Sequence, residues 1–319
     1  MKVSLVVPLR NEERSLPNLL ESIGRQTFPP AEIILVDGGS SDRTVELARE
    51  AATHQKIRVI EAGPATPGRG RNVGIAEASN EWVALTDAGN RLEETWLERL
   101  VSSAEADPEI DIVYGNFEPI KDSWFTRCAA LAYPPPKSMR PGGIMRGPFI
   151  ASSLVRRDVW RKIGGFPDLR AAEDLIFMDR VRQAGCKIGW SPNATVWWEM
   201  QPDVPSTFRR FELYSRNNVW VRRQWDWHYG LARQYLVAGF LLILGILYTP
   251  WWLTAIAALF AARIFRSVWR RREGRGFFWA LNPARLAGVG LIVLTIDLAT
   301  FVGWARALTS KPALGTKSD

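Results

Sequence analysis

Two long stretches near the carboxyl end of the sequence carry almost no charge. No charged residue occurs from Leu236 to Ala262, and Leu286 to Ala305 contains only Asp297. About 20 apolar residues in a helix span the hydrocarbon part of a bilayer, whereas helices of soluble cores are usually shorter. The two stretches therefore predict a membrane region at residues 231–308, preceded by a folded domain at residues 1–205.

The charges around these stretches set the expected number of spans. The loop between them is rich in arginine: Arg263, Arg266, Arg270, Arg271, Arg272, Arg275 and Arg285. Such loops stay on the cytoplasmic side of a membrane. A hairpin broken at Thr249-Pro250 puts this loop and the first domain on that same side, and it gives three segments at 231–248, 250–265 and 286–305. One kinked helix in place of the hairpin gives two spans, and a re-entrant hairpin is a further alternative.

The net charge of +8 is confined to the carboxyl-terminal part of the chain. Residues 1–199 hold 25 Lys and Arg against 27 Asp and Glu, whereas residues 200–319 hold 16 against 6. Because the excess is interleaved with apolar runs, it indicates membrane lipids as partners and argues against nucleic acid. The apolar run at the start is too short for a signal peptide. These features predict a multi-pass protein of the inner or plasma membrane whose first domain is cytoplasmic.

The first 115 residues alternate between short apolar runs and helical patterns, which is typical of βα units around a largely parallel sheet. The runs expected to form strands are Val3–Val7, Ile33–Val36, Ile57–Ile60 and Trp82–Thr86. We expect a loop at 63–70 and a short helix at 72–78. Asp37 and Asp87 each follow a strand, and ligands bind at that edge of an open α/β sheet.

The region after residue 115 is less regular. The proline- and glycine-rich segments at 133–136 and 141–143 indicate a surface loop or lid. A buried strand at 150–155 and helices at 157–163 and 173–184 follow. Glu173 and Asp174 fall in the first turn of the last helix, where acidic side chains are favourable.

Asp37, Asp87 and Asp174 are side chains that can bind a ligand or a metal, or accept a proton. Asp37 can accept hydrogen bonds from a base or a ribose, Asp87 can bind a divalent cation that neutralises a diphosphate, and Asp174 can take a proton from an acceptor. Each also has a structural alternative. Asp37 fits a turn, Asp87 fits the turn Asp87-Ala88-Gly89-Asn90, and Asp174 fits a helix start.

Together, several motifs resemble those of family 2 glycosyltransferases with the GT-A fold. They are, in order, Val6-Val7-Pro8-Leu9-Arg10-Asn11-Glu12, Val36-Asp37-Gly38-Gly39-Ser40-Ser41-Asp42-Arg43-Thr44, Gly70-Arg71-Asn72-Val73-Gly74, Gly164-Gly165-Phe166 and Glu173-Asp174. The resemblance covers about residues 1–200. It implies a Rossmann-like α/β fold with a mixed, mostly parallel sheet flanked by helices and followed by carboxyl-terminal transmembrane helices.

The resemblance also implies roles for individual residues. It implies that Pro8, Glu12 and Asp37 line the nucleotide pocket and that Arg71 lies near the diphosphate. Asp87 and Ala88 fall in the position of the DxD metal motif, and Asp174 is the implied general base. The implied reaction inverts the anomeric carbon, and the implied partners are a nucleotide-sugar donor and a lipid-linked or glycan acceptor.

Two departures from the family pattern affect the metal, which would be Mg²⁺ or Mn²⁺. Gly89 replaces the second carboxylate of the DxD motif. Glu199 stands where many relatives place a histidine ligand, and it fits either a metal ligand or a partner for an arginine. If no metal binds, Arg71 or another cation must offset the charge of the leaving diphosphate.

Residues 206–230 alternate arginines with aromatic residues and predict an interfacial amphipathic segment. Within it, Arg209 and Arg210 are candidates for binding a lipid phosphate. Residues 309–319 form a short tail.

Two other functions compete with sugar transfer. A catalytically silent scaffold of the same fold would bind nucleotide or glycan without turnover, and the altered metal motif favours it. A nucleotide-dependent oxidoreductase depends only on the glycines of residues 68–74, whose spacing and position after the third strand differ from the dinucleotide fingerprint.

Overall fold

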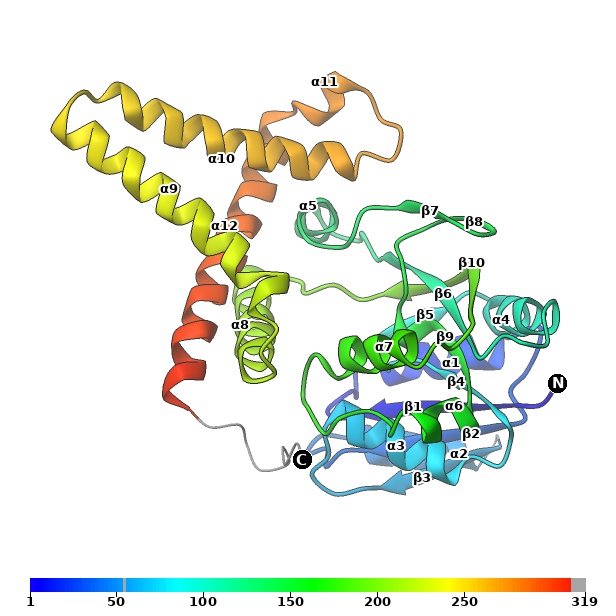
Figure 1. Ribbon diagram of the computed structural model, residues 1–319. Helices are drawn as coiled ribbons and strands as arrows, with labels where there is room; N and C mark the ends of the chain where they lie inside the picture. The colour runs from blue at the N-terminus through cyan, green and yellow to red at the C-terminus, as the bar shows by residue number, and fades with distance from the viewer. Residues whose placement is uncertain (54–55, 311–319) are drawn as a thin grey trace. The chain divides into compact units, whose positions relative to one another are not determined.

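The computed structural model describes residues 1–53 and 56–310 (Figure 1). They form two compact units. Residues 1–120 and 137–199 make a unit built on a sheet, here called the sheet unit. Residues 121–136 and the described residues from 200 onward make a unit of helices, here called the helical unit. Most of the expected tail at 309–319 lies outside the described residues.

The sheet unit contains an eight-stranded sheet in the order β3-β2-β1-β4-β9-β6-β10-β5. Its strands are β1 (Val3–Leu9), β2 (Glu32–Asp37), β3 (Ile57–Glu61), β4 (Trp82–Leu85), β5 (Asn90–Leu92), β6 (Ile112–Pro119), β9 (Ser153–Arg156) and β10 (Ile188–Trp198). β1 pairs in parallel with β2 and β4, and β2 with β3. β9 is antiparallel to β4 and β6, while β6 and β10 are parallel. The predicted mixed, mostly parallel sheet is thus confirmed.

Helices cover both faces of this sheet. They are α1 (Leu16–Gly24), α2 (Thr44–Ala52), α3 (Pro67–Glu77), α4 (Trp96–Glu105), α6 (Arg157–Lys162) and α7 (Glu173–Gln183). Alternate residues of β1 face opposite cores, because side chains of a strand point to alternate faces. Leu5 and Val7 pack with residues of α1, α2 and α4. Val6 packs with residues of α3, α6 and α7, which cover the other face.

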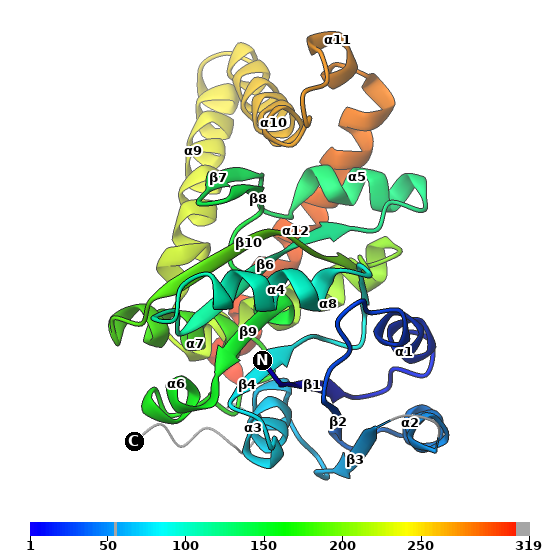
Figure 2. The same cartoon turned by 90° about the vertical axis from the view of Figure 1, so that its right-hand side faces the viewer.

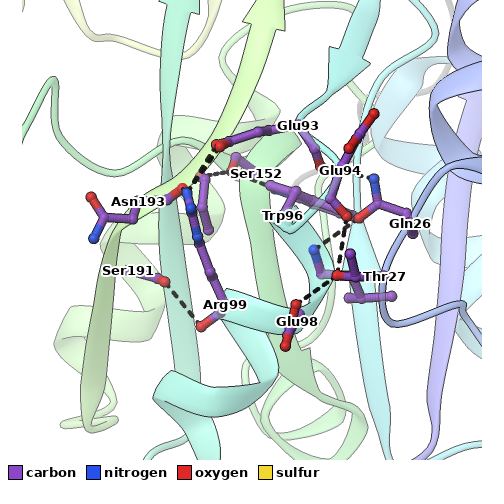
Figure 3. Close-up of polar contacts among 12 residues, drawn as sticks. Gln26, Thr27, Glu93, Glu94, Trp96, Glu98, Arg99, Ser152, Ser191 and Asn193 are labelled. Atoms are coloured by element: carbon purple, nitrogen blue, oxygen red, sulfur yellow. Dashed lines mark hydrogen bonds and ion pairs between the residues drawn. The ribbon is translucent and has the colours of Figure 1, made fainter.

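Polar contacts fix α4 to the rest of the sheet unit (Figure 3). The Gln26 side chain accepts a hydrogen bond from the Leu97 backbone at 3.0 Å and donates to the Glu93 carbonyl at 2.8 Å. The first of these bonds satisfies a backbone N–H group that the start of a helix leaves without a partner. At the buried face, Trp96 Nε1 donates to Ser152 Oγ at 2.9 Å, and Ser152 donates to the Ala194 carbonyl at 3.2 Å. α4 is therefore held to Gln26, which follows α1, to Ser152 and, through Ser152, to Ala194 of β10.

Three sequence predictions differ from the structure in this unit. α3 begins at Pro67, inside the predicted loop, because Thr66 caps it by accepting a hydrogen bond from the Arg69 backbone at 3.2 Å. Only the second half of the predicted strand at 150–155 is extended, since Ile150–Ser152 forms a 3₁₀ turn. Part of the predicted loop is a hairpin of β7 (Ser138–Arg140) and β8 (Gly143–Met145).

The helical unit consists of α5 (Trp124–Ala132), α8 (Val204–Trp220), the 3₁₀ turn η2 (Gln224–Asp226), α9 (His228–Leu247), α10 (Trp251–Arg270), α11 (Phe277–Ala280) and α12 (Pro283–Thr309). By length and composition, α9, α10 and α12 are able to cross a membrane. α9 and α10 form the hairpin that the break at Thr249-Pro250 predicts (Figure 1). α5 was not predicted from the sequence.

α8 packs along α12, where small residues allow close approach. A Cβ atom on Gly303 would lie 2.5 Å from the Glu212 carbonyl oxygen and 2.7 Å from the Ser215 Cβ. Ser215 donates to the Thr300 carbonyl at 2.7 Å. Small residues and interhelical hydrogen bonds of this kind hold membrane helices together, because lipid provides little hydrophobic driving force. The predicted amphipathic segment is thus largely a helix with one polar face packed on α12.

The one carboxylate of the long apolar helix α12 is paired. Arg263 of α10 makes two bonds to Asp297, at 2.6 and 2.7 Å. Tyr235 of α9 donates its hydroxyl to the same carboxylate at 2.9 Å. Asp297 is almost completely buried. A single carboxylate therefore joins the three membrane-type helices.

Candidate active site

The loops after β1 and β2 meet at the carboxyl edge of the sheet. Leu9 and Asp37 are register partners at the ends of these strands. The Asn11 backbone donates to Ser40 Oγ at 2.9 Å, and Asn11 Oδ1 accepts from the Ser41 backbone at 2.8 Å. The Glu12 backbone donates to Thr44 Oγ1 at 2.7 Å. The motif at residues 6–12 and the motif at residues 36–44 are thus held together at this edge.

Asp37 shapes its own loop. Its Oδ2 accepts hydrogen bonds from the backbones of Gly39 and Ser40, at 2.9 and 3.0 Å, and Ser40 Oγ also donates to its carboxylate. Asp37 is buried, with 3% of its surface exposed. The turn role that the sequence left open is therefore present in the structure.

Glycines bring α3 close to this edge. A Cβ on Gly70 would lie 3.1 Å from Pro8 Cβ, and one on Gly74 would lie 2.3 Å from Val6 Cγ1. A Cβ on Gly68 would meet the Pro167 carbonyl oxygen at 2.2 Å. The glycine spacing that resembled a dinucleotide fingerprint thus serves close packing of a helix on β1 and on the segment before α7.

Arg71 of α3 binds two carboxylates of the candidate site, those of Asp87 and Glu173. Its guanidinium donates to Glu173 Oε1 at 2.8 Å and to Asp87 Oδ1 at 2.6 Å. The Arg71 side chain is only 4% exposed, so these are strong charge-assisted bonds in a poorly hydrated place. Residues from the turn after β4 and from the start of α7 are thereby held to one helix.

The electrostatics of this cluster follow from three carboxylates around one arginine. Burial alone would lower the pKa of Arg71, but the Asp87 and Glu173 carboxylates outweigh it and raise that pKa above its ordinary value. Burial, and next the charge of Asp174, raises the pKa of Glu173 to about 7, although Arg71 opposes the rise. Burial likewise raises the pKa of Asp174, against the effect of Arg71. A raised pKa makes a carboxylate a stronger base when it is ionised.

Glu173 and Asp174 differ in access. The Glu173 side chain is 8% exposed and is bound to Arg71. Asp174 is partly exposed, and its Oδ1 accepts a short-range bond from the Leu175 backbone at 2.8 Å. Among the described residues no hydrogen bond to Asp174 Oδ2 occurs, which leaves that oxygen able to contact a ligand.

Asp87 begins a tight turn between β4 and β5. The Asn90 backbone donates to the Asp87 carbonyl at 3.1 Å, and the Glu199 backbone donates to the Gly89 carbonyl at 3.1 Å. The Ala88 side chain is buried in the core. The Asp87 side chain is bound to Arg71 through Oδ1 and is 43% exposed, so part of its carboxylate stays accessible.

At this turn one carboxylate, that of Asp87, is in a position to bind a metal ion. Across residues 1–53 and 56–310, no three His, Cys, Asp or Glu side chains gather as a metal site. Glu199 pairs with Arg91 at 3.4 Å, which is the arginine-partner alternative for that residue. Asp87 Oδ2 accepts no hydrogen bond from the described residues. Mg²⁺ is commonly held by one or two carboxylates together with substrate phosphates, and Asp87 fits that pattern.

Asn72 is a residue of the site that sequence reasoning missed. Its Oδ1 accepts from Trp160 Nε1 and from the Phe166 backbone, both at 2.9 Å, and its Nδ2 donates to the Phe166 carbonyl at 2.7 Å. Gly165 adopts φ +68° beside it. Asn72 thus fixes the Gly164-Gly165-Phe166 turn that leads toward Asp174. In the sequence, only the position of Asn72 beside Arg71 in the motif at residues 70–74 indicated a role in the site.

An open α/β sheet binds ligands at its carboxyl edge, where this chain carries carboxylates, and the class of proteins with such sheets includes many nucleotide-dependent enzymes. The comparisons with known proteins narrow this class. The model of "Glycosyl transferase family 2" matches residues 4–162. The chain belongs to this family.

Several curated proteins resemble the chain. "Probable glycosyltransferase YdaM" of Bacillus subtilis is 29% identical over 254 residues, which cover 75% of this chain and 57% of that protein. Glycosyltransferase AglE of Haloferax volcanii is 30% identical over 191 residues, covering 57% and 62%. The O-antigen chain rhamnosyltransferase RfbN of Salmonella typhimurium is 26% identical over 239 residues, covering 70% and 75%. The chain thus spans about three fifths of the length of the first two relatives.

Solved structures share the fold. The mannosyltransferase PcManGT of Pyrobaculum calidifontis, in complex with GDP-Man and Mn²⁺, matches with a TM-score of 0.56 and 19% identity over 96% of this chain and 87% of that chain. Residues 1–349 of S. aureus TarS in complex with UDP match with a TM-score of 0.52 and 17% identity, over 99% and 95%. The expected GT-A fold is thereby confirmed.

Proposed function

We propose that this glycosyltransferase moves a sugar from a nucleoside-diphosphate donor to a lipid-linked or glycan acceptor, with inversion at the anomeric carbon. The observation that carries the proposal is the cluster in which Arg71 binds both Asp87 and Glu173, with Asp174 next to Glu173 at the start of α7. This cluster lies at the edge of the sheet where α/β enzymes bind ligands. Nucleotide complexes of the similar TarS and PcManGT support a nucleotide donor.

In the proposed site each predicted residue has a separate role. Pro8, Glu12 and Asp37 line the nucleotide pocket, and the backbone at Ala88 lies along the donor. Asp37 contributes mainly by fixing the shape of its loop, because its carboxylate already accepts hydrogen bonds from the Gly39 and Ser40 backbones. Arg71 orients Asp87 and offsets negative charge near the diphosphate. Asp174 Oδ2 accepts the proton of the acceptor hydroxyl as that oxygen attacks the anomeric carbon.

A divalent cation, Mg²⁺ or Mn²⁺, would be held in this proposal by Asp87 together with the donor diphosphate. When bound, it neutralises the charge that develops on the leaving diphosphate. The Mn²⁺ complex of PcManGT supports this assignment. Glu199 contributes only if it leaves Arg91.

The membrane orientation is also a proposal. α9, α10 and α12 are treated as three spans, and the arginine-rich connection between α10 and α12 favours the cytoplasmic face. The sheet unit then works in the cytoplasm, where nucleotide sugars are made available, and membrane lipids surround the helical unit.

Asp87→Asn tests the metal assignment. We expect the half-saturating concentration of Mn²⁺ or Mg²⁺ for nucleotide diphosphate release to rise by about tenfold or more, because the neutral amide is a poor ligand for a hard cation. The measurement is a metal titration of release by the purified full chain. Glu199→Gln is the matched control and should shift the titration by less than about threefold. An unchanged titration for Asp87→Asn contradicts the assignment.

A further inference from the structure

A hollow lined by cations lies within the helical unit. Its volume is about 160 Å³, and its lining comes from α5, from the connection between α10 and α12, and from the start of α12. Six of its lining residues are cationic: Lys121, Arg127, Arg271, Arg272, Arg275 and Arg285. Among its described lining residues only Glu273 is acidic. We call this hollow the basic pocket.

Tryptophan rings hold several of these cations in place. The guanidinium carbons of Arg275 and Arg285 lie 4.6 and 3.6 Å from the ring centre of Trp279. Arg285 also donates to the Trp279 carbonyl. Arg272 stacks on Trp269 at 3.6 Å. Stacking fixes the plane of a guanidinium while its N–H groups can still bind phosphate in a bidentate manner.

The positive charge of the basic pocket is poorly balanced by protein. Lys121 pairs with Glu273 at 3.5 Å. In the described part of the chain, Arg127, Arg272, Arg275 and Arg285 form no ion pair with a carboxylate. Like charges held this close repel one another, and a bound anion relieves that repulsion.

The position of the basic pocket points to a lipid. It lies where α10 ends and α12 begins, which is the boundary of two candidate membrane spans. α5 contacts α12 there, and the two helices cross in Figure 2. Exposed aromatic side chains accompany it: Trp124 is 50%, Phe277 is 52% and Phe278 is 87% exposed. Aromatic and basic residues together mark the depth of lipid headgroups.

We propose that the basic pocket binds the phosphate or diphosphate headgroup of a membrane lipid. A terminal phosphate carries nearly two negative charges, and a diphosphate carries more, which suits a cluster of six cations better than a singly charged phosphodiester does. The residues of the basic pocket belong to the helical unit, whereas those of the proposed nucleotide site belong to the sheet unit. Its residues also differ from Arg209 and Arg210, the candidates that the sequence offered for a lipid phosphate.

The probe for this proposal is farnesyl diphosphate, offered to the full chain in phosphatidylcholine nanodiscs. Saturating UDP and GDP are present so that the donor site is filled. We expect saturable binding that the Arg127→Ala/Arg275→Ala double variant weakens by about tenfold or more, because charge-assisted bonds to phosphate are lost. Farnesol, which lacks phosphate, should not compete.

The matched control is Arg266→Ala/Arg270→Ala. It removes the same charge from exposed positions of α10 that do not line the pocket, and it should bind as the wild type does. Arg127→Gln/Arg275→Gln repeats the test if the alanine variant loses thermal stability. Equal weakening by the control overturns the proposal, because general surface charge then explains binding. Competition by inorganic pyrophosphate at the same strength as farnesyl diphosphate also overturns it, since the site would then be one for free phosphate.

Discussion

Replacing Asp174 by Asn should lower turnover by about 10² to 10⁴ while donor affinity stays within about threefold of the wild type. The amide cannot take the proton of the acceptor hydroxyl. Its oxygen can still accept the bond from the Leu175 backbone, so the start of α7 should keep its shape. Steady-state rates and direct donor-binding measurements on the same preparation separate these two effects.

Asp179→Asn is the matched control for this result, because it changes a carboxylate on the same helix away from Arg71. Its turnover should stay close to that of the wild type. A turnover for Asp174→Asn within about threefold of the wild type contradicts the assignment of the base. Loss of donor binding in that variant would indicate a role in binding instead.

Asp297→Ala should destabilise the helical unit by about 3–5 kcal/mol, the usual effect of removing one partner of a buried pair. Arg263 would then remain among apolar helices with no carboxylate, and Tyr235 would lose its acceptor. A charge without a partner in this environment is costly. Thermal unfolding of the purified protein in a fixed detergent measures the change.

A double variant separates the ion pair from simple packing. Arg263→Leu/Asp297→Leu should recover most of the stability lost in Asp297→Ala, because an apolar pair of similar volume often replaces a buried ion pair without loss. Leu294→Ala on the exposed side of α12 is the control and should cost little. If Asp297→Ala melts at the wild-type temperature, the pair does not join the three helices.

The sequence predicted the first four strands because each is a short, buried apolar run in a repeating βα pattern. It did not predict β5, β6 or β10. β5 has three residues, and β10 is interrupted by an irregularity between Ser191 and Thr195. Such strands are set by pairing with distant neighbours, which a local pattern does not contain.

The sequence motifs named the residues of the candidate site, but they did not reveal the hydrogen bonds between them. The motifs brought Asp37, Asp87 and Asp174 to attention, and the structure added the bonds from Arg71 that distinguish Glu173 from Asp174. Those bonds join residues 16 and 102 positions apart in the sequence. The role of Asn72 in fixing the turn at Phe166 was hidden for the same reason.

The membrane-type helices were predictable from composition, since length and apolarity alone define them. Their partners were not. The basic pocket requires α5, which the sequence pattern left as part of an irregular region, beside arginines more than 130 residues later. Only the folded chain brings these segments together.

The most direct test of the central claim is nucleotide diphosphate release by the purified full chain, with a panel of UDP, GDP and dTDP sugars, Mn²⁺ and a lipid extract as acceptor source. At least one donor should give release with matching transfer of sugar, and Asp174→Asn should abolish most of it. Nucleotide binding without release for every donor, with wild type and Asp174→Asn behaving alike, would contradict it and favour the silent scaffold.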